Sequence, residues 1–185
     1  MSEETMIRNC APTLAGIKTG NLFRCSYETA EDMREAVRHW NRLLGKKGVR
    51  ILPLRYQKKH ALMYVYRPSH LSADLRNASA DAILKRCGYT AKTSEHCIVE
   101  LMKRLRSDTD FPHEIGLFLG YPPEDVSGFM EQKACGYKCV GCWKVYGDEQ
   151  ACRKRFAQYK RCTETYESLL QKGRSVLSMT VSEFI

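Results

Sequence analysis

Three cysteine thiols lie close together in this sequence and are of a type that binds metals. Cys135, Cys139 and Cys142 fall within eight residues, so their thiolates could reach one zinc ion or one iron–sulfur cluster. Cys152 would add a fourth ligand only if the fold brought the following helix back to the group. The alternatives are a redox dithiol at Cys139 and Cys142, or buried cysteines without chemistry. The sequence leaves these alternatives open and assigns no cofactor.

A thiol and an imidazole form a second candidate for chemistry. Cys10 precedes Pro12 in a segment where we expect a helix to break and another to start, and a thiol near a helix N-terminus can have a lowered pKa. His113 would act as its base, and Glu114 or Asp125 would orient the imidazole. We therefore expect nucleophilic catalysis if the fold brings Cys10 and His113 together. A structural role for the histidine is the simpler alternative.

Other chemistries find less support in the sequence. Gly116 and Gly120 lack the context of a phosphate-binding loop, and Leu117 stands where a metalloprotease motif requires a second histidine. The net charge of +9 would suit a polyanion. The basic residues are spread along the chain, with one cluster on the last predicted helix, comprising Arg153, Lys154, Arg155, Lys160 and Arg161. Because no nucleic-acid motif accompanies them, a solvated helix face is the favoured interpretation and nucleic-acid binding the alternative.

The elements that must position these residues can be predicted from hydrophobic patterns. Ile115 to Gly120 is apolar throughout, which indicates a central strand covered on both faces. Pro123 then opens a helix whose first turn carries acidic residues. We expect a ligand site at the end of this strand, with Tyr121 in its wall.

The remaining segments alternate between helix and strand. We expect a helix over 3–10 that breaks before Pro12, one long helix over 72–87, and a final helix after Asp148. Thr29 should cap a helix that ends at Leu44. Strands are predicted over 22–26, 49–56, 61–67 and 143–146, with a hairpin turn over 57–60 and a bulge or free edge at Pro53.

This order predicts an α/β protein with a mixed sheet of about five strands, one hairpin, and covering helices. We expect a single domain over residues 1–185, with a weakly determined tail over 174–185. No window approaches the roughly 20 apolar residues of a membrane span, and no signal peptide is recognisable. The protein is therefore expected to be cytoplasmic, with its nine cysteines reduced or acting as ligands.

Several long blocks of this chain resemble one bacterial family that is catalogued only as a domain of unknown function. The blocks run over Asn9 to Lys18, Phe111 to Pro122, Glu124 to Val126 with Gly128 and Phe129, and Trp143 to Tyr146. The resemblance covers nearly the whole chain. The family is typical of anaerobic bacteria and is associated with genes for flavodoxin and iron uptake, so the resemblance implies redox-linked anaerobic metabolism without assigning an activity.

The resemblance also implies that the polar and aromatic residues of these blocks belong to a site. Beside the catalytic candidates, the expected ligand-binding residues are Thr13, Lys18, Tyr121, Trp143, Lys144 and Tyr146. Lys18 or Lys144 would hold an anionic group. The leading hypothesis is a small-molecule or redox-linked enzyme or accessory protein, with a pocket between the Cys10 segment and the His113 strand. The alternative is a metal-binding module that meets an acidic, flavodoxin-like electron carrier through its basic surface.

Overall fold

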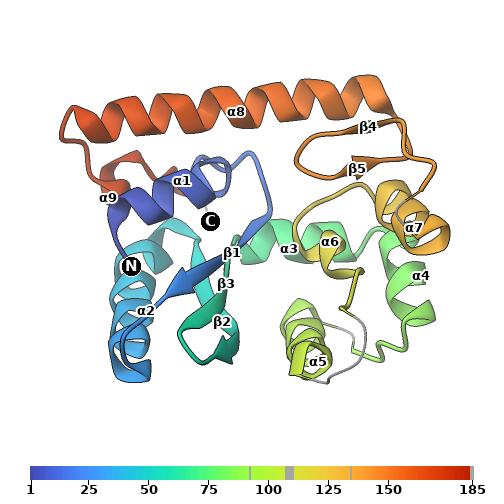
Figure 1. Cartoon of the computed structure of the whole chain (residues 1–185), viewed down its shortest axis with the longest axis horizontal. Coiled ribbons are helices and arrows are strands. Elements are labelled where there is room, and N and C mark those ends of the chain that lie inside the picture. The colour runs from blue at the N-terminus through green and yellow to red at the C-terminus, as the bar shows by residue number, and fades with distance from the viewer. Residues whose placement is uncertain (92, 107–110, 134, 184–185) are drawn as a thin grey trace. The chain divides into compact units, whose positions relative to one another are not determined.

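The computed structural model describes residues 1–91, 93–106, 111–133 and 135–183. In it, the hairpin predicted around residues 57–60 supplies two strands of a three-stranded antiparallel sheet. β2 (Arg50–Gln57) and β3 (His60–Tyr66) form the hairpin, and β1 (Gly20–Ser26) pairs with the other side of β3 (Figure 1). β2 is therefore an edge strand, and its register shifts between Pro53 and Arg55. Both the hairpin and the irregularity at Pro53 are confirmed.

The chain divides into two compact units. The first unit consists of Met1–Ser69 and Tyr159–Ile185, and the second unit of His70–Gln158. Besides the sheet, the described elements of the first unit are α1 (Glu3–Leu14), α2 (Ala30–Leu44), the 3-10 helix η1 (Gly45–Lys47), the end of α8 (Glu149–Gln171) and α9 (Val176–Met179).

One face of the three-stranded sheet forms the core of the first unit. Phe23, Met63 and Val65 lie on this face and pack with the apolar sides of α1 and α2. The helix α2 begins at a capping box: Thr29 Oγ1 accepts a hydrogen bond from the Asp32 amide at 3.1 Å, and the Thr29 amide donates to the Asp32 carboxylate at 3.2 Å. The predicted helix up to Leu44 is thereby confirmed.

A fully buried arginine, Arg67, binds the C-terminal end of α1. The Arg67 guanidinium donates hydrogen bonds to the carbonyl oxygens of Thr13 (2.7 Å), Leu14 (2.7 Å) and Val181 (2.8 Å), and lies 3.3 Å from a Glu183 carboxylate oxygen. The last carbonyl groups of a helix have no partner within the helix. The Gly16 and Val181 amides each donate to one of the two α1 carbonyls, and Arg67 adds a charged donor to both while it joins the C-terminal segment to α1.

The predicted break in the first helix is wrong. α1 continues through Pro12 to Leu14 and ends before Gly16, whose φ is +74°. Proline removes one helical hydrogen bond, but the residues around it, from Cys10 to Leu14, are all buried. Packing of this last turn therefore outweighs the local preference for a break.

The second unit is mainly helical. Its described elements are the greater part of α3 (Pro68–Leu75), α4 (Ala78–Arg86), α5 (Ser94–Arg106), α6 (Ile115–Phe118), α7 (Pro123–Gln132), the strands β4 (Cys139–Val140) and β5 (Lys144–Val145), and the start of α8. The single helix predicted over 72–87 is wrong, because α3 ends at Leu75 and Asn77 caps α4 by accepting hydrogen bonds from the amides of Ser79 and Ala80.

The predicted central strand at Ile115 to Gly120 is also wrong, because this segment forms the short helix α6. Every residue from Ile115 to Leu119 is buried, and a continuous apolar run is compatible with a buried helix as well as a buried strand. Gly120 ends the helix with φ +74°, and the Tyr121 amide donates to the Gly116 carbonyl at 3.0 Å.

The fold class nevertheless agrees with the prediction. The described residues form an α/β protein with five strands, arranged as the three-stranded sheet and the β4–β5 hairpin. The tail over 174–185 contributes α9, and Val176 there is fully buried. Among the described helices, none combines the length and the apolar character that crossing a membrane would need.

Candidate functional site

A cleft of about 380 Å³ lies within the second unit, and we call it the aromatic cleft. The segments that form it are α6 with the residues just before and after it, α7, and the β4–β5 hairpin. It contains five residues expected at a ligand or catalytic site, namely His113, Tyr121, Asp125, Trp143 and Lys144. The full lining is His113, Ile115, Gly116, Tyr121, Asp125, Val126, Phe129, Val140, Gly141, Cys142, Trp143 and Lys144.

Aromatic rings make up much of the wall. Tyr121 and Trp143 stack with their centroids 4.5 Å apart and an angle of 26° between the rings. Phe156 meets Trp143 edge-on at 4.5 Å, and His113 meets Phe129 edge-on at 4.8 Å. These are the offset and edge-to-face arrangements that aromatic pairs prefer. The wall is therefore packed into a defined shape before any ligand arrives.

Gly116 in α6 allows close packing in the wall of the aromatic cleft. A Cβ atom at Gly116 would lie 2.8 Å from Val126 Cγ2 and 3.1 Å from Tyr121 Cδ2. The absence of a side chain on α6 thus allows α7 and the Tyr121 ring to approach its backbone. This close approach explains why a glycine stands in the middle of an otherwise apolar helix.

Two side chains of the cleft can carry positive charge. The Lys144 ammonium lies 4.7 Å from the Tyr137 ring centroid and 6.0 Å from that of Phe129, which are cation–π distances. His113 is exposed. The cleft therefore presents the Lys144 ammonium and the His113 imidazole beside an aromatic wall.

Asp125 is the only carboxylate among the described lining residues, and its oxygens are occupied by the surrounding structure. Oδ2 accepts the Trp143 indole N–H at 2.7 Å, and Oδ1 accepts the Tyr146 and Gly147 amides at 2.7 Å each. The Cys152 thiol donates to Oδ2 at 3.3 Å. Asp125 thus ties the second hairpin strand and the start of α8 to the first turn of α7.

The Cys152 thiol is a weak acid in this setting. Burial, and then the hydrogen bond and negative charge of Asp125, raise its pKa to about 12. A neutral thiol can donate to the carboxylate, whereas a thiolate would be repelled by it. Cys152 therefore serves as a donor to Asp125, and this protonated form is a poor metal ligand.

Glu114 also has structural partners. It is buried, accepts a hydrogen bond from the Tyr89 hydroxyl at 3.1 Å and lies 3.9 Å from Arg104 Nε. Burial and the negative charge of Glu114 raise the pKa of the Tyr89 hydroxyl. Since both carboxylates have such partners, a role for Glu114 or Asp125 in orienting His113 stays a prediction.

Cys10, Thr13 and Lys18, the predicted site residues of the block over Asn9 to Lys18, belong to the first unit. Cys10 lies inside α1 rather than at its start and is fully buried; desolvation raises its thiol pKa, so the expected lowering is wrong. Thr13 Oγ1 donates to Asn21 Oδ1 at 2.7 Å, and the buried Lys18 ammonium lies 5.8 Å from the Tyr159 ring centroid. A joint pocket of these residues with His113 stays a prediction.

The cysteine cluster does not form a ready metal site. Cys135 and Cys142 are exposed whereas Cys139 is buried in β4. Within the described ranges, no three histidine, cysteine or acidic side chains are grouped closely enough to hold a metal ion. Zinc or iron–sulfur binding by Cys135, Cys139 and Cys142 therefore stays a prediction.

The cysteines should differ strongly in reactivity. At pH 8 we expect iodoacetamide to modify Cys135 and Cys142 at least about tenfold faster than Cys10 and Cys152, because only the first pair is exposed and thiolates are the reactive form. A time course of peptide mass spectra on the folded protein would measure this. In urea the four rates should converge, and rapid native labelling of Cys10 would restore its candidacy as a nucleophile.

Tyr146 does not line the aromatic cleft, although it was expected among the ligand-binding residues. Its ring packs on Gly128, where a Cβ atom would lie 2.5 Å from the ring. Its hydroxyl oxygen is buried and has no hydrogen-bond partner within the described structure. Tyr146 therefore supports α7 from the hairpin and is absent from the lining of the aromatic cleft.

Residues that the site analysis of the sequence did not select also line the cleft. Val126 and Phe129 were recognisable as the apolar face of α7 from their spacing of three residues, but this pattern does not distinguish a core face from a ligand wall. Val140 gave a weaker signal, since β4 has only two residues.

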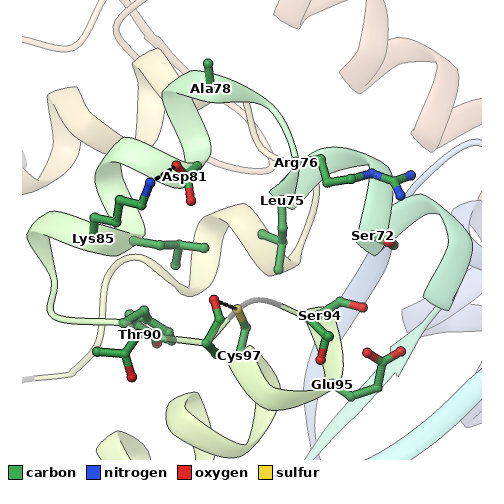
Figure 2. A pocket seen from close by; sticks show the side chains of 14 residues that line it. Ser72, Leu75, Arg76, Ala78, Asp81, Lys85, Thr90, Ser94, Glu95 and Cys97 are labelled. Atoms are coloured by element: carbon green, nitrogen blue, oxygen red, sulfur yellow. Dashed lines mark hydrogen bonds and ion pairs between the residues drawn. The ribbon is translucent and has the colours of Figure 1, made fainter.

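A larger cavity of about 860 Å³ lies elsewhere in the second unit (Figure 2). It is bordered by α3, α4 and the start of α5. Asp81 and Lys85 form an ion pair at 2.6 Å on one side, and the Cys97 thiol lies 4.0 Å from the Ala91 carbonyl on another. Its charges are of both signs and partly paired, so it indicates no particular ligand.

The basic residues of α8 are exposed, as expected for a solvated helix face. Arg153 pairs with Glu149 at 2.7 Å, and Lys160 approaches Glu164 at 3.9 Å. Such pairs along a helix reduce its net charge. Nucleic-acid binding through α8 and docking of a flavodoxin-like carrier both stay predictions.

Comparison with known proteins identifies the family and no activity. No curated protein and no solved structure matches the chain. A family model described as a protein of unknown function, DUF3793, matches residues 6–180, which include both units and the whole aromatic cleft. The chain therefore belongs to the DUF3793 family.

Proposed function

We propose that this protein binds a small planar molecule carrying an anionic group, in the aromatic cleft of its second unit. This narrows the broader expectation of a small-molecule or redox-linked enzyme or accessory protein of anaerobic metabolism. The observation that carries the proposal is that two separate blocks of the family resemblance, Phe111 to Pro122 and Trp143 to Tyr146, supply half of the described lining of one cleft.

The composition of the lining supports a planar, mostly apolar ligand. Small-molecule sites are typically clefts of about 300–1,000 Å³ with apolar and aromatic walls and a few polar groups. The aromatic cleft falls at the lower end of this range. Tyr121, Trp143 and Phe129 offer ring surfaces against which a planar group can stack.

The distribution of charge supports an anion. Lys144 and His113 bring positive or chargeable groups to the lining, whereas the Asp125 oxygens accept hydrogen bonds from the indole, two amides and a thiol. The carboxylate charge is therefore already stabilised by the protein. A carboxylate or sulfonate on the ligand would gain from Lys144 without competing with Asp125.

The proposal is tested with naphthalene-2-carboxylate and its neutral analogue 2-naphthalenemethanol. In ¹H–¹⁵N NMR spectra, the Trp143 indole signal should shift on titration with the carboxylate, while the Trp40 indole in the first unit should not. The neutral analogue should bind about tenfold more weakly, which corresponds to about 1.4 kcal/mol.

Two variants separate the aromatic and ionic contributions. Tyr121→Ala and Lys144→Gln should each weaken binding of the carboxylate about five- to tenfold. Lys103→Gln, at an exposed position of α5 in the same unit, makes the same charge change and should have no effect. Equal binding of the two probes would remove the anionic part of the proposal, and an unshifted Trp143 signal would remove all of it.

A further inference from the structure

A second hollow, independent of the aromatic cleft, lies within the first unit and is lined by residues of one sign of charge. It measures about 590 Å³. It lies between the end of α2 with η1 and the segment around α9. Its described lining consists of Arg42, Leu43, Lys46, Lys47, Ser175, Leu177, Ser178 and Ser182. We propose that this hollow binds a phosphate group.

Among the described residues that border the hollow there are three cations and no carboxylate. Arg42 stands in the last turn of α2, and Lys46 and Lys47 follow in η1. None of the three forms an ion pair with another described residue. A concave surface with charges of one sign concentrates its electric field, so it attracts anions more strongly than the same charges spread on a flat surface.

One acidic residue, Glu183, lies beside η1, but its carboxylate has another partner. The Glu183 amide donates to the Lys47 carbonyl at 3.4 Å, which brings the C-terminal segment against η1. The Glu183 carboxylate, however, lies 3.3 Å from the Arg67 guanidinium. Its charge is thus directed toward the buried arginine at the end of α1.

Hydroxyl groups complement the cations. Ser175 Oγ accepts the Ser178 amide at 3.2 Å, and Ser178 Oγ donates to the Ser175 carbonyl at 2.8 Å, so these two shape the wall. Ser182 adds a third hydroxyl to the lining. Arginine, lysine and serine together are the side chains that most often bind phosphate oxygens.

The helix dipole explains only part of this arrangement. Cations are favoured at the C-terminus of a helix, which accounts for Arg42 and Lys46 at the end of α2. It does not account for a hollow beside them, nor for the serine residues that face them from a segment more than 120 positions later. A bound anion would account for both.

Calorimetric titration of the full chain with inorganic phosphate tests the proposal. We expect saturable binding that the double variant Lys46→Gln/Lys47→Gln weakens at least tenfold. The control Lys58→Gln/Lys59→Gln removes the same charge from the exposed turn between β2 and β3 and should bind phosphate as the wild type does. Equal weakening in both double variants, or no saturable binding, would overturn the proposal.

A second arm identifies the source of the phosphate group. Co-sedimentation with vesicles of phosphatidylcholine containing phosphatidate, and with phosphatidylcholine vesicles alone, would follow the same variants. Phosphatidate-dependent sedimentation that is lost only in Lys46→Gln/Lys47→Gln would indicate a lipid headgroup, whereas phosphate binding without sedimentation would indicate a soluble phosphate. The Trp143 signal should remain unchanged by phosphate, so the two proposed sites can fail separately.

Discussion

Replacing Asp125 with alanine is expected to lower the free energy of unfolding of the second unit by about 3–5 kcal/mol, because a buried charged acceptor is lost from a connected network. The indole N–H of Trp143 and the amides of Tyr146 and Gly147 would lose their acceptor. Each unsatisfied buried donor costs about 1–3 kcal/mol, and the costs are not additive.

The conservative change separates charge from shape. In Asp125→Asn one oxygen can still accept the two amides, but the new NH₂ group would face the indole N–H and the Cys152 thiol, which are also donors. We expect a loss of about 1–3 kcal/mol. Glu124→Gln, an exposed change in the same turn of α7, should stay within about 0.5 kcal/mol of the wild type.

The chain offers one tryptophan reporter for each unit. Trp40 is buried in the first unit and Trp143 in the second. Labelling with 5-fluorotryptophan and recording ¹⁹F NMR spectra along a urea series would follow both units in one sample, with Trp40→Phe assigning the signals. An unchanged transition of the Trp143 signal in Asp125→Ala would show that the hydrogen-bond network contributes little.

Arg67→Met should have a similarly large effect on the first unit, about 3–5 kcal/mol, because it removes a buried charge with several partners. The carbonyl oxygens of Thr13, Leu14 and Val181 would each lose a guanidinium donor, and Glu183 would lose its ion-pair partner. The Thr13 and Leu14 carbonyls would keep only the Gly16 and Val181 amides. The Trp40 signal in the same ¹⁹F experiment measures the loss.

Two further variants test this explanation. Arg67→Lys keeps the charge but has one ammonium group in place of a planar fork, so it should recover only part of the stability. Arg24→Met, at an exposed position of β1, removes a guanidinium from the same sheet and should cost less than about 1 kcal/mol. A Trp40 transition that Arg67→Met leaves in place would contradict the assigned role.

Elements with strong local signals could be predicted from the sequence. The helix after Thr29 has a capping box and an apolar stripe, and the β2–β3 hairpin has alternating residues around a polar turn. The helix after Asp148 begins where its cap predicts, with the Ala151 amide donating to the aspartate at 2.9 Å. In each case the signal lies within a few residues, so no tertiary information is needed.

The elements that were missed depend on contacts between distant residues. Ile115 to Phe118 is apolar on every side, and only its packing against Val126 and Tyr121 decides for a helix over a strand. The α1 helix continues through Pro12 because its last turn is buried. Cys10 was misjudged for the same reason, since burial rather than helix position controls its thiol pKa.

The sequence selected His113, Tyr121, Asp125, Trp143 and Lys144, and these five side chains line one cleft. Their assignment to a functional site stays a prediction. The role of Asp125 was not apparent, although a buried tryptophan usually requires an acceptor for its indole N–H and so gave an indirect signal. No signal in the sequence indicated the role of Arg67, because an arginine at the end of a strand is normally exposed to solvent.

The separation in sequence between Arg67 and its acceptors has a consequence for synthesis of the protein. Val181 and Glu183 follow Arg67 by 114 and 116 residues, and the contiguous second unit lies between them. During translation the second unit can therefore complete its own contacts while the first still lacks two of the groups that compensate its buried charge. The first unit therefore cannot complete the contacts of Arg67 until this late segment leaves the ribosome, whereas the second unit can fold as a unit before then.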